Sequence, residues 1–263
     1  MLQSRREKII EMIQAERMLK VSDLMKIFDV SIETIRRDLE YLEKQGLLTR
    51  VYGGAVLNQK KGKEPLYEQR EIKHYAEKTA IARRAVELIE DGDVLGIDIG
   101  TTAREFAKAL LGKKRVIVLT NSMPIAEILS EDENIRVIML GGEVRKGEFS
   151  VSGFVAEQVM SRFNLDKYIL GIGGLTVENG ITDYHIEETN LRRVMLDRSQ
   201  KVIGLTDYSK FGVIAMNEVC PLSRLDVLIT DSRADRAILG KMHTMKTEVI
   251  QIDALEDREK TDA

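Results

Sequence analysis

The feature that most constrains the fold of this chain is an alternation of short apolar runs with amphipathic stretches, beginning at Val94. Each run has the length of a buried strand, and several of the stretches between them have helical spacing. Strand and helix alternation over this length is typical of an α/β domain with a mostly parallel sheet. The runs read VLGIDI, VIVL, VIML, YILGI, VIGL and VLIT.

The part of the chain before Asn58 predicts a small helical unit instead. Apolar residues at helical spacing predict one helix over 4–15 and a second short helix for which Ser22 is placed as the cap. The segment DVS makes a tight turn, and Ser31 can accept from the free N–H groups of a third helix, which Gly46 ends. Two short helices joined by a tight turn are typical of a helix-turn-helix.

The third helix presents a surface suited to reading DNA. Its apolar residues form one stripe, and Arg37 lies almost opposite, with Thr34 beside it and Arg36 on the flank. Arg can bond guanine bidentately and Thr can meet a thymine methyl group, as readout in the major groove requires. Taken alone, the same face also fits an ordinary solvated helix surface. The stripe consists of Ile32, Ile35, Leu39 and Leu42.

The residues after this helix favour the DNA-reading interpretation. The stretch LLTRVYGGAVL carries Arg50 and Tyr52 and turns at Gly53 and Gly54, which predicts a two-stranded wing. Residues 1–58 carry ten Lys and Arg against nine Asp and Glu, and the whole chain has a formal net charge of −3. DNA binding therefore depends on how the basic side chains are arranged, because the unit has almost no excess charge.

The stretch NQKKGKEP, residues 58–65, marks the expected domain boundary. It is polar, contains a Gly and a Pro, and has no apolar period. We therefore predict a winged helix-turn-helix domain over 1–57, a linker over 58–65 and a larger α/β domain over 66–263. Residues 66–92 have helical spacing and end at Gly92, which predicts a charged connecting helix.

Several turns that follow the predicted strands are polar or rich in glycine. In an open α/β sheet, ligands bind at the carboxyl ends of the strands, where turns lead into helices with free N–H groups. Small residues let the backbone approach an anion, hydroxyls bond its oxygens, and Arg or Lys supplies charge. Together these turns predict a pocket for a phosphorylated small molecule with hydroxyl groups. They contain Gly100, Thr101 and Thr102, then Thr120, Asn121 and Ser122, then Gly141, Gly142 and Arg145, then GGLTVENGITD, and finally Lys210.

Each of these turns has a simpler interpretation when it is taken alone. A Gly-Thr-Thr after a strand is also typical of a tight turn with a helix cap, and Lys210 alone fits an ordinary surface lysine. Asp98 is less usual, because a carboxylate inside an apolar strand needs partners that offset its desolvation. Those partners are either sugar hydroxyls or the N–H groups of neighbouring loops.

Other kinds of site have little support in the sequence. Cys220 is the only cysteine and the three histidines are scattered, so we expect no disulfide, no metal site and no cofactor. No apolar run is long enough to span a membrane, and the first residues are charged where a signal peptide would be apolar. We therefore expect a cytoplasmic protein.

The motifs together resemble a known family over most of the chain, from Ser4 to Asp253. The stretch SIETIRRDLEYLEKQGLLTRVYGGAV closely resembles the winged helix-turn-helix of DeoR-family bacterial transcription regulators. The later motifs DIGTT, LTNS, LGGEVR, GIGGLTVENGITD and TDYSKFG resemble the sugar-phosphate sensor domain of that family, whose fold looks like that of ribose-5-phosphate isomerase.

The resemblance implies a regulator that binds double-stranded operator DNA, as a repressor of a sugar catabolism operon or occasionally as an activator. A phosphorylated sugar would control its affinity for the operator, and a homo-oligomer, dimer or tetramer, would place two recognition helices about 34 Å apart. Implied DNA contacts are Ser31, Thr34, Arg36, Arg37, Arg50, Tyr52 and Gly53. Implied effector contacts are Asp98, Gly100, Thr101, Thr102, Thr120, Asn121, Gly142, Arg145, Asp183 and Lys210.

Two enzymatic alternatives remain open at this point. GIDIGTT also matches the first phosphate motif of actin-like sugar kinases, although that motif lies on a hairpin and the residues after Thr102 have helical spacing. An active sugar-phosphate isomerase fused to a DNA-binding module is the other alternative. Glu187, Glu188, Asp183 and Lys210 would then be acid/base groups, and otherwise remnants of them or simple ligand contacts.

Overall fold

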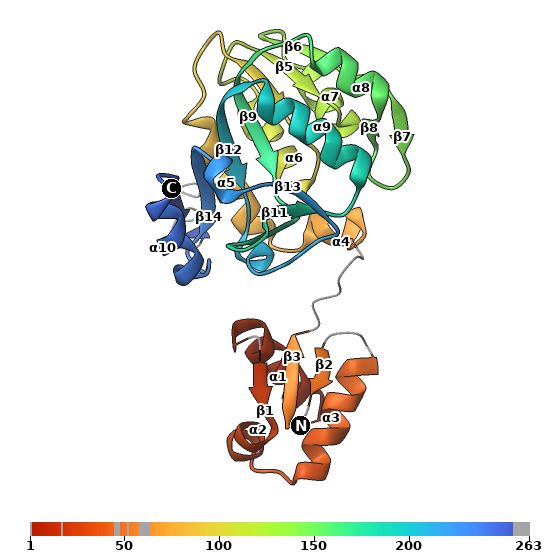
Figure 1. Cartoon of the computed structure of the whole chain (residues 1–263), viewed down its shortest axis with the longest axis vertical. Helices are drawn as coiled ribbons and strands as arrows, with labels where there is room; N and C mark the ends of the chain where they lie inside the picture. The colour runs from red at the N-terminus through yellow and green to blue at the C-terminus, as the bar shows by residue number, and fades with distance from the viewer. Residues whose placement is uncertain (1, 17, 45–47, 52, 58–63, 255–263) are drawn as a thin grey trace. The chain divides into compact units, whose positions relative to one another are not determined.

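A computed structural model describes residues 2–16, 18–44, 48–51, 53–57 and 64–254. The chain divides into two compact units, Met1–Lys60 and Lys61–Ala263 (Figure 1). The division falls inside the stretch that the sequence predicts as the linker. Most of that stretch lies outside the described residues, so its exact bounds stay a prediction.

The first unit is a winged helix-turn-helix, as predicted. Three helices pack against a small antiparallel sheet with the strand order β1-β3-β2. Strands β2 and β3 form the predicted wing, whereas the short strand β1 is not indicated by the sequence pattern. The elements are α1 (Leu2–Glu16), β1 (Met18–Lys20), α2 (Val21–Phe28), α3 (Ile32–Lys44), β2 (Leu48–Val51) and β3 (Gly54–Leu57).

The apolar stripe of α3 faces the core of this unit. Ile35, Leu39 and Leu42 are buried there, as their spacing predicts. The predicted cap of α2 is wrong: β1 runs directly into the helix, so Lys20 occupies the N-cap position in extended conformation, without a capping side chain. The hydroxyl of Ser22 instead donates to the carboxylate of Asp23.

The second unit is built on a parallel seven-stranded sheet, which confirms the predicted fold class. The strand order is β15-β14-β12-β9-β4-β5-β6, so the chain crosses over repeatedly between strands. The sequence runs locate every strand except β15, whose residues EVIQI alternate with charge and amide. The strands are β4 (Val94–Ile97), β5 (Val116–Thr120), β6 (Ile135–Met139), β9 (Leu165–Gly171), β12 (Ser199–Leu205), β14 (Val227–Asp231) and β15 (Glu248–Ile252).

Helices cover both faces of this sheet (Figure 1). Successive side chains of a strand point to opposite faces, so Tyr168 and Leu170 of β9 join one core and Ile169 joins the other. One core contains residues of α8, α9 and α10, and the other contains residues of α5, α6 and α7. The helices are α4 (Tyr67–Ile72), α5 (Tyr75–Val86), α6 (Thr101–Leu110), α7 (Met123–Ser130), α8 (Phe154–Met160), α9 (Ile186–Asp197) and α10 (Arg236–Thr244).

The helices before β4 and several smaller elements lie outside the seven-stranded sheet. The expected single helix over 66–92 is interrupted at His74, whose backbone is left-handed with φ 54°, so α4 and α5 are separate helices. Among the described residues, none of the helices combines the length and apolar character that crossing a bilayer requires.

The remaining elements are the hairpin β7 (Glu143–Arg145) and β8 (Ser150–Ser152), the sheet of β10 (Gly174–Thr176), β11 (Gly180–Asp183) and β13 (Asn217–Cys220), and the 3-10 turns η1 (Tyr208–Lys210) and η2 (Leu222–Arg224).

Candidate functional site

The predicted Gly-Thr-Thr turn leads from β4 directly into α6. Gly100 is the N-cap residue with φ 107°, and Thr101 and Thr102 begin the helix without a side-chain cap. The first N–H groups of a helix have no partner within the helix, and its N-terminus is positive. This end of α6 therefore suits an anion. It also counts against the kinase alternative, because that phosphate motif requires a hairpin and α6 is a helix.

The turn after β5 is held together mainly by its own side chains. The N–H of Ser122 donates to Thr120 Oγ1 at 3.1 Å, and Ser122 Oγ accepts from the N–H of Ile125 at the start of α7. Asn121 Nδ2 donates to the carbonyl oxygen of Val151 at 3.0 Å. The Oδ1 atom of Asn121 is buried and accepts no hydrogen bond from any described residue, so one acceptor remains for a ligand.

Asp98 belongs to a buried network of charges. Arg192 of α9 donates through Nε to Asp98 Oδ2 at 2.7 Å, and its Nη1 lies 2.9 Å from Asp183 Oδ1. The N–H of Gly171 also donates to Asp98 Oδ2. Burial raises the pKa of Asp98 to about 6, while the positive charge of Arg192 acts in the opposite direction. Both acidic residues predicted as effector contacts therefore connect β4, β11 and α9, and the sequence did not indicate Arg192.

Gly142 and Arg145 lie at the β7–β8 hairpin. A Cβ atom on Gly142 would lie 2.4 Å from the carbonyl oxygen of Ser152, so close packing of the backbone explains this glycine. Arg145 Nη1 pairs with Glu188 Oε2 at 2.6 Å, and Nη2 pairs with Glu64. The guanidinium of Arg145 is thus held between two carboxylates at the carboxyl edge.

Three further cations gather near these residues. Arg70 of α4 forms ion pairs with Glu64 and Glu148, and Lys78 of α5 donates to the carbonyl oxygen of Arg70. Burial is the main cause that lowers the pKa of Lys78 to about 8; Asp207 opposes this shift, and the charge of Lys210 adds to it. Lys210 Nζ forms no hydrogen bond or ion pair within the described part of the chain. Burial lowers its pKa, against the effect of Asp207.

Lys78 and Arg70 are two basic residues of this edge, besides Arg192, that the sequence analysis did not identify. For Lys78 a signal was present: Lys78 stands at the spacing of Ile81, Ala82 and Ala85, the buried face of α5. A lysine inside an apolar helix stripe indicates either a buried partner or a site. Arg70 carries no comparable signal, because α4 buries none of its residues.

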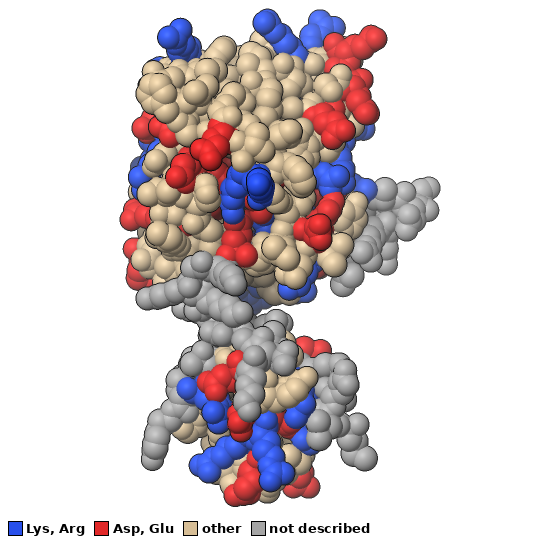
Figure 2. All heavy atoms as spheres, turned by 90° about the vertical axis from the view of Figure 1, so that its right-hand side faces the viewer, with Lys and Arg blue, Asp and Glu red and all other residues tan. Residues whose placement is uncertain are grey.

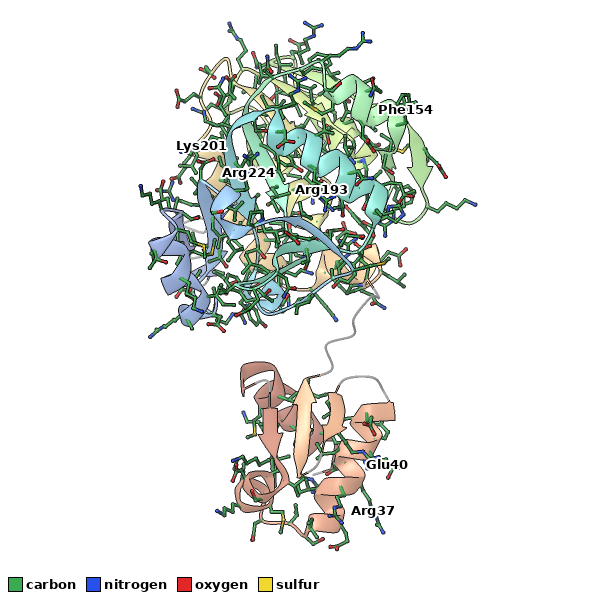
Figure 3. The ribbon with its side chains drawn as sticks, viewed as in Figure 1. Arg37, Glu40, Phe154, Arg193, Lys201 and Arg224 are labelled. Carbon is green, nitrogen blue, oxygen red and sulfur yellow. The ribbon has the colours of Figure 1, made fainter. Side chains whose placement is uncertain are left out.

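The DNA-binding unit exposes Arg36 and Arg37 on α3. Within the described residues neither forms a hydrogen bond or ion pair, and Arg37 extends outward from the helix (Figure 3). Basic side chains gather on the face of this unit shown in Figure 2. Ser31 Oγ accepts from the N–H of Thr34 and lies 3.1 Å from Thr34 Oγ1, so Ser31 caps α3 as predicted.

The wing carries Arg50 beside the same helix. Arg50 Nε pairs with Glu43 Oε2 at 2.7 Å, and its N–H donates to the same carboxylate. Gly53 is exposed in the wing turn with φ 78°, whereas Tyr52 lies outside the described residues. A hollow of about 420 Å³ separates α3 from the wing. Its lining consists of Val21, Ile32, Arg36, Leu39, Arg50, Gly53 and Gly54.

Comparison with known proteins identifies both units. Residues 5–61 match the family described as DeoR-like helix-turn-helix domain, and residues 73–232 match the DeoR C terminal sensor domain. The chain belongs to the DeoR family. It is therefore a DNA-binding transcription regulator with a sensor domain, which confirms the family and the general function predicted from the motifs.

Curated relatives resemble this DeoR-family chain over nearly their whole length. The HTH-type transcriptional regulator GolR of Listeria innocua is 35% identical over 90% of this chain and 93% of its own. The putative aga operon transcriptional repressor of Escherichia coli O157:H7 is 34% identical over 94% of this chain and 93% of its own. The glycerol-3-phosphate regulon repressor of Escherichia coli K12 is 35% identical over 85% of this chain and 88% of its own.

Solved structures resemble the DeoR-family chain more distantly. Ribose 5-phosphate isomerase A from Methanocaldococcus jannaschii is 18% identical, with a TM-score of 0.38 over 51% of this chain and 53% of that chain. A match this weak, over about half of each chain, gives no information about activity. The individual DNA and effector contacts in this DeoR-family chain accordingly stay predictions, supported by the geometry described above.

Proposed function

We propose that this DeoR-family regulator is a repressor that releases its operator when a phosphorylated sugar or polyol binds at the carboxyl edge of the sensor sheet. The observation that carries the proposal is the unpartnered ammonium group of Lys210 on the same edge as the N-terminus of α6. One strand, β9, separates β12 from β4, so the ends of the two strands that lead to Lys210 and to α6 lie about 10 Å apart. That spacing suits a small phosphorylated molecule.

The names of relatives support a ligand of this class. One relative is a glycerol-3-phosphate regulon repressor and another is a putative aga operon repressor. The ligand of the present protein then carries a phosphate and several hydroxyl groups. Asn121 Oδ1 and the hydroxyls of Thr101 and Thr102 are the groups we assign to its polar contacts.

A ligand screen tests this function directly. We expect a phosphorylated sugar or polyol to raise the melting temperature of the full-length protein and to release a labelled operator fragment, because a ligand that binds only the native state stabilises it. The panel contains glycerol 3-phosphate, pentose and hexose phosphates and their unphosphorylated forms. Equal effects of the unphosphorylated compounds would contradict a phosphate-specific sensor.

We also infer that the ligand is bound and not converted. The acid/base role considered for Asp183 and Glu188 needs a carboxyl group that is free to exchange a proton with the substrate. Asp98 and Asp183 pair with Arg192, and Glu188 accepts from Ser150 Oγ and pairs with Arg145. Incubation with ribose 5-phosphate, or with ATP, magnesium and sugars, should give no product in an NMR spectrum. Turnover in either mixture would restore the corresponding enzymatic alternative.

The DNA-bound form is proposed to be a homo-oligomer in the cytoplasm. Residues 1–57 would read DNA, 58–65 connect, and 66–263 sense the ligand and assemble, with two recognition helices about 34 Å apart. Exposed apolar side chains on β7, in the turn before β8 and on α8 support assembly, Phe154 among them (Figure 3). They are Val144, Phe149, Phe154 and Val155.

The oligomer is tested by the variant Phe154→Glu. We expect a smaller mass in analytical ultracentrifugation and weaker operator binding, because a carboxylate in an apolar interface is desolvated without a partner. An unchanged mass would place the subunit interface elsewhere on the sensor.

A further inference from the structure

Glu64 ties the start of the sensor unit to the candidate ligand site. It is the first described residue after 58–63 and lies in neither a helix nor a strand. Its carboxylate pairs with Arg145 and lies 3.2 Å from Nη2 of Arg70. Arg70 Nε also donates to the carbonyl oxygen of Pro65 at 3.1 Å. The first residues of the sensor unit are therefore held by the same two guanidinium groups that line the carboxyl edge.

Each of these guanidinium groups has a second carboxylate. Arg70 pairs with Glu148 in the turn of the β7–β8 hairpin, and Arg145 pairs with Glu188 of α9. Glu148 and Glu188 are only 6% and 2% exposed, and the surrounding fold holds them in place. Glu64 forms no other hydrogen bond or ion pair within the described part of the chain. It is thus the carboxylate that can leave without disrupting a regular element.

We propose that Glu64 is an internal competitor of the effector: the phosphate of the ligand takes Arg70 and Arg145 from the Glu64 carboxylate and so releases the segment that enters the sensor. The inference rests on the proposed function, because it assumes a phosphorylated ligand at this edge. A phosphate carries up to two negative charges and more acceptor oxygens than a carboxylate, and guanidinium groups bind it bidentately.

The charges at this edge favour exchange over joint binding. Glu148 and Glu188 remain in place, so a phosphate that bound beside Glu64 would add to three carboxylates around two guanidinium groups. Like charges at short distance repel, and departure of Glu64 relieves that repulsion. Lys210 lies in η1 at the same edge, and after burial and Asp207 the charges of Arg70 and Glu64 also act on its pKa.

The exchange couples ligand binding to the DNA-binding unit. While Glu64 is bound, the chain leaves the sensor from a fixed point at residue 64; after release, the first fixed element is α4, which begins at Tyr67. In an oligomer, loss of this fixed exit point leaves the second DNA-binding unit less well placed for its half-site, so its effective concentration there falls. Loss of the Glu64 contacts should therefore weaken operator binding, because the anchor is lost, and strengthen ligand binding, because the competitor is lost. Coupling between two sites is typically worth about 5- to 150-fold in affinity.

The variant Glu64→Gln in the full-length protein tests this inference, with Glu68→Gln as the matched control. Glu68 is exposed on α4 and forms no hydrogen bond or ion pair within the described residues, so the control removes the same charge nearby. Operator affinity is measured by fluorescence anisotropy without ligand, and again during titration with glycerol 3-phosphate and with inorganic phosphate.

We expect Glu64→Gln to bind the operator about fivefold or more weakly without ligand, and to respond to a phosphate probe at about fivefold lower concentration. Glu68→Gln should match the wild type in both measurements. Glu64→Asp, which keeps the charge on a shorter side chain, should fall between them, and circular dichroism melting checks that each variant is folded.

The outcomes separate this inference from the proposed function. If Glu64→Gln binds the operator like Glu68→Gln without ligand, the anchoring role of Glu64 is overturned whether or not any probe binds. If the wild type responds to a probe but Glu64→Gln needs as much of it, competition is overturned while the sensor function stands. If Glu64→Gln loses operator affinity and no protein responds to any probe, the anchor is supported and phosphate sensing by this site is overturned.

Discussion

The role of Lys210 in ligand binding can be tested directly by substitution. The variant Lys210→Ala should bind the operator normally but need about tenfold or more ligand for release, because a hydrogen bond to a charged group contributes about 1.5–3 kcal/mol. Ligand titration of an operator complex measures this. Lys201→Ala is the control and should respond like the wild type, because Lys201 lies near the start of β12 (Figure 3), whereas Lys210 lies in η1 after the end of that strand. A normal response in Lys210→Ala would remove this lysine from the ligand site.

The buried side chain of Lys78 should make the stability of the protein depend on pH. Its pKa is about 8 in the folded protein, against 10.5 for an ordinary lysine, because of burial. Between these pH values the unfolded chain binds more protons than the folded chain, so the free energy of unfolding rises with pH. Relative to Lys78→Met, the wild type should gain about 2–3 kcal/mol between pH 8 and 10.5.

Urea unfolding at several pH values measures this difference for Lys78. The control is Lys73→Met, because Lys73 is exposed at the end of α4 and its loss should leave the pH dependence of the wild type intact. If the free energy of unfolding depends on pH in the same way in Lys78→Met and in the wild type, Lys78 keeps its proton throughout this range.

At the scale of single residues, local chemistry was predictable and long-range partners were not. The need of Asp98 for partners follows from a carboxylate in an apolar run, and the structure shows it 1% exposed. Its partner Arg192 lies 94 residues further along the chain, where nothing local marks it as a buried charge. Glu64 likewise looked like part of a polar linker, because its two Arg partners become its neighbours only in the fold.

Helix α3 is the element on which DNA recognition depends. Arg37→Ala should weaken operator binding by about 1–3 kcal/mol and relax the preference for one base, if Arg37 reads a base edge as its exposed position indicates. Arg136→Ala removes the same charge from an exposed position on β6 and serves as the control. Anisotropy titrations against single-base operator variants measure both effects. An equal loss of affinity for all the operator variants would instead indicate that Arg37 contacts a phosphate.

Among the elements, periodicity located those whose apolar pattern is long. The strands of the parallel sheet other than β15 follow from their apolar runs, and α6 follows from the spacing after Thr102. Strand β1 has only three residues, and β15 alternates like a surface strand, so neither gives a clear signal. The break at His74 depends on a left-handed backbone residue, which helical spacing does not reveal.

At the scale of the whole molecule, the two units have separate cores and should unfold separately. The core of the DNA-binding unit contains no residue of the sensor cores. Asp38 of α3 is 1% exposed and holds Arg5 and Arg6 of α1 at 2.6 and 2.7 Å. Asp38→Asn leaves both guanidinium groups without their charged partner, at a cost of about 2–3 kcal/mol after allowance for their partial exposure.

Differential scanning calorimetry tests this separation. We expect two transitions, of which Asp38→Asn lowers only the one that belongs to the DNA-binding unit. The fragment 61–263 supplies the assignment, because its single transition should coincide with the unaffected one. A variant that shifts both transitions together would show that the two units unfold cooperatively.

The strand order of the sensor sheet also bears on how the protein forms during synthesis. Strand β4 pairs with β9, which the ribosome adds about seventy residues later, whereas the first unit closes its contacts within sixty residues. Contacts between distant parts of a chain form slowly, and domains made first fold first. Each new molecule therefore has a folded DNA-binding unit before it has a sensor, and during that interval no metabolite can regulate it.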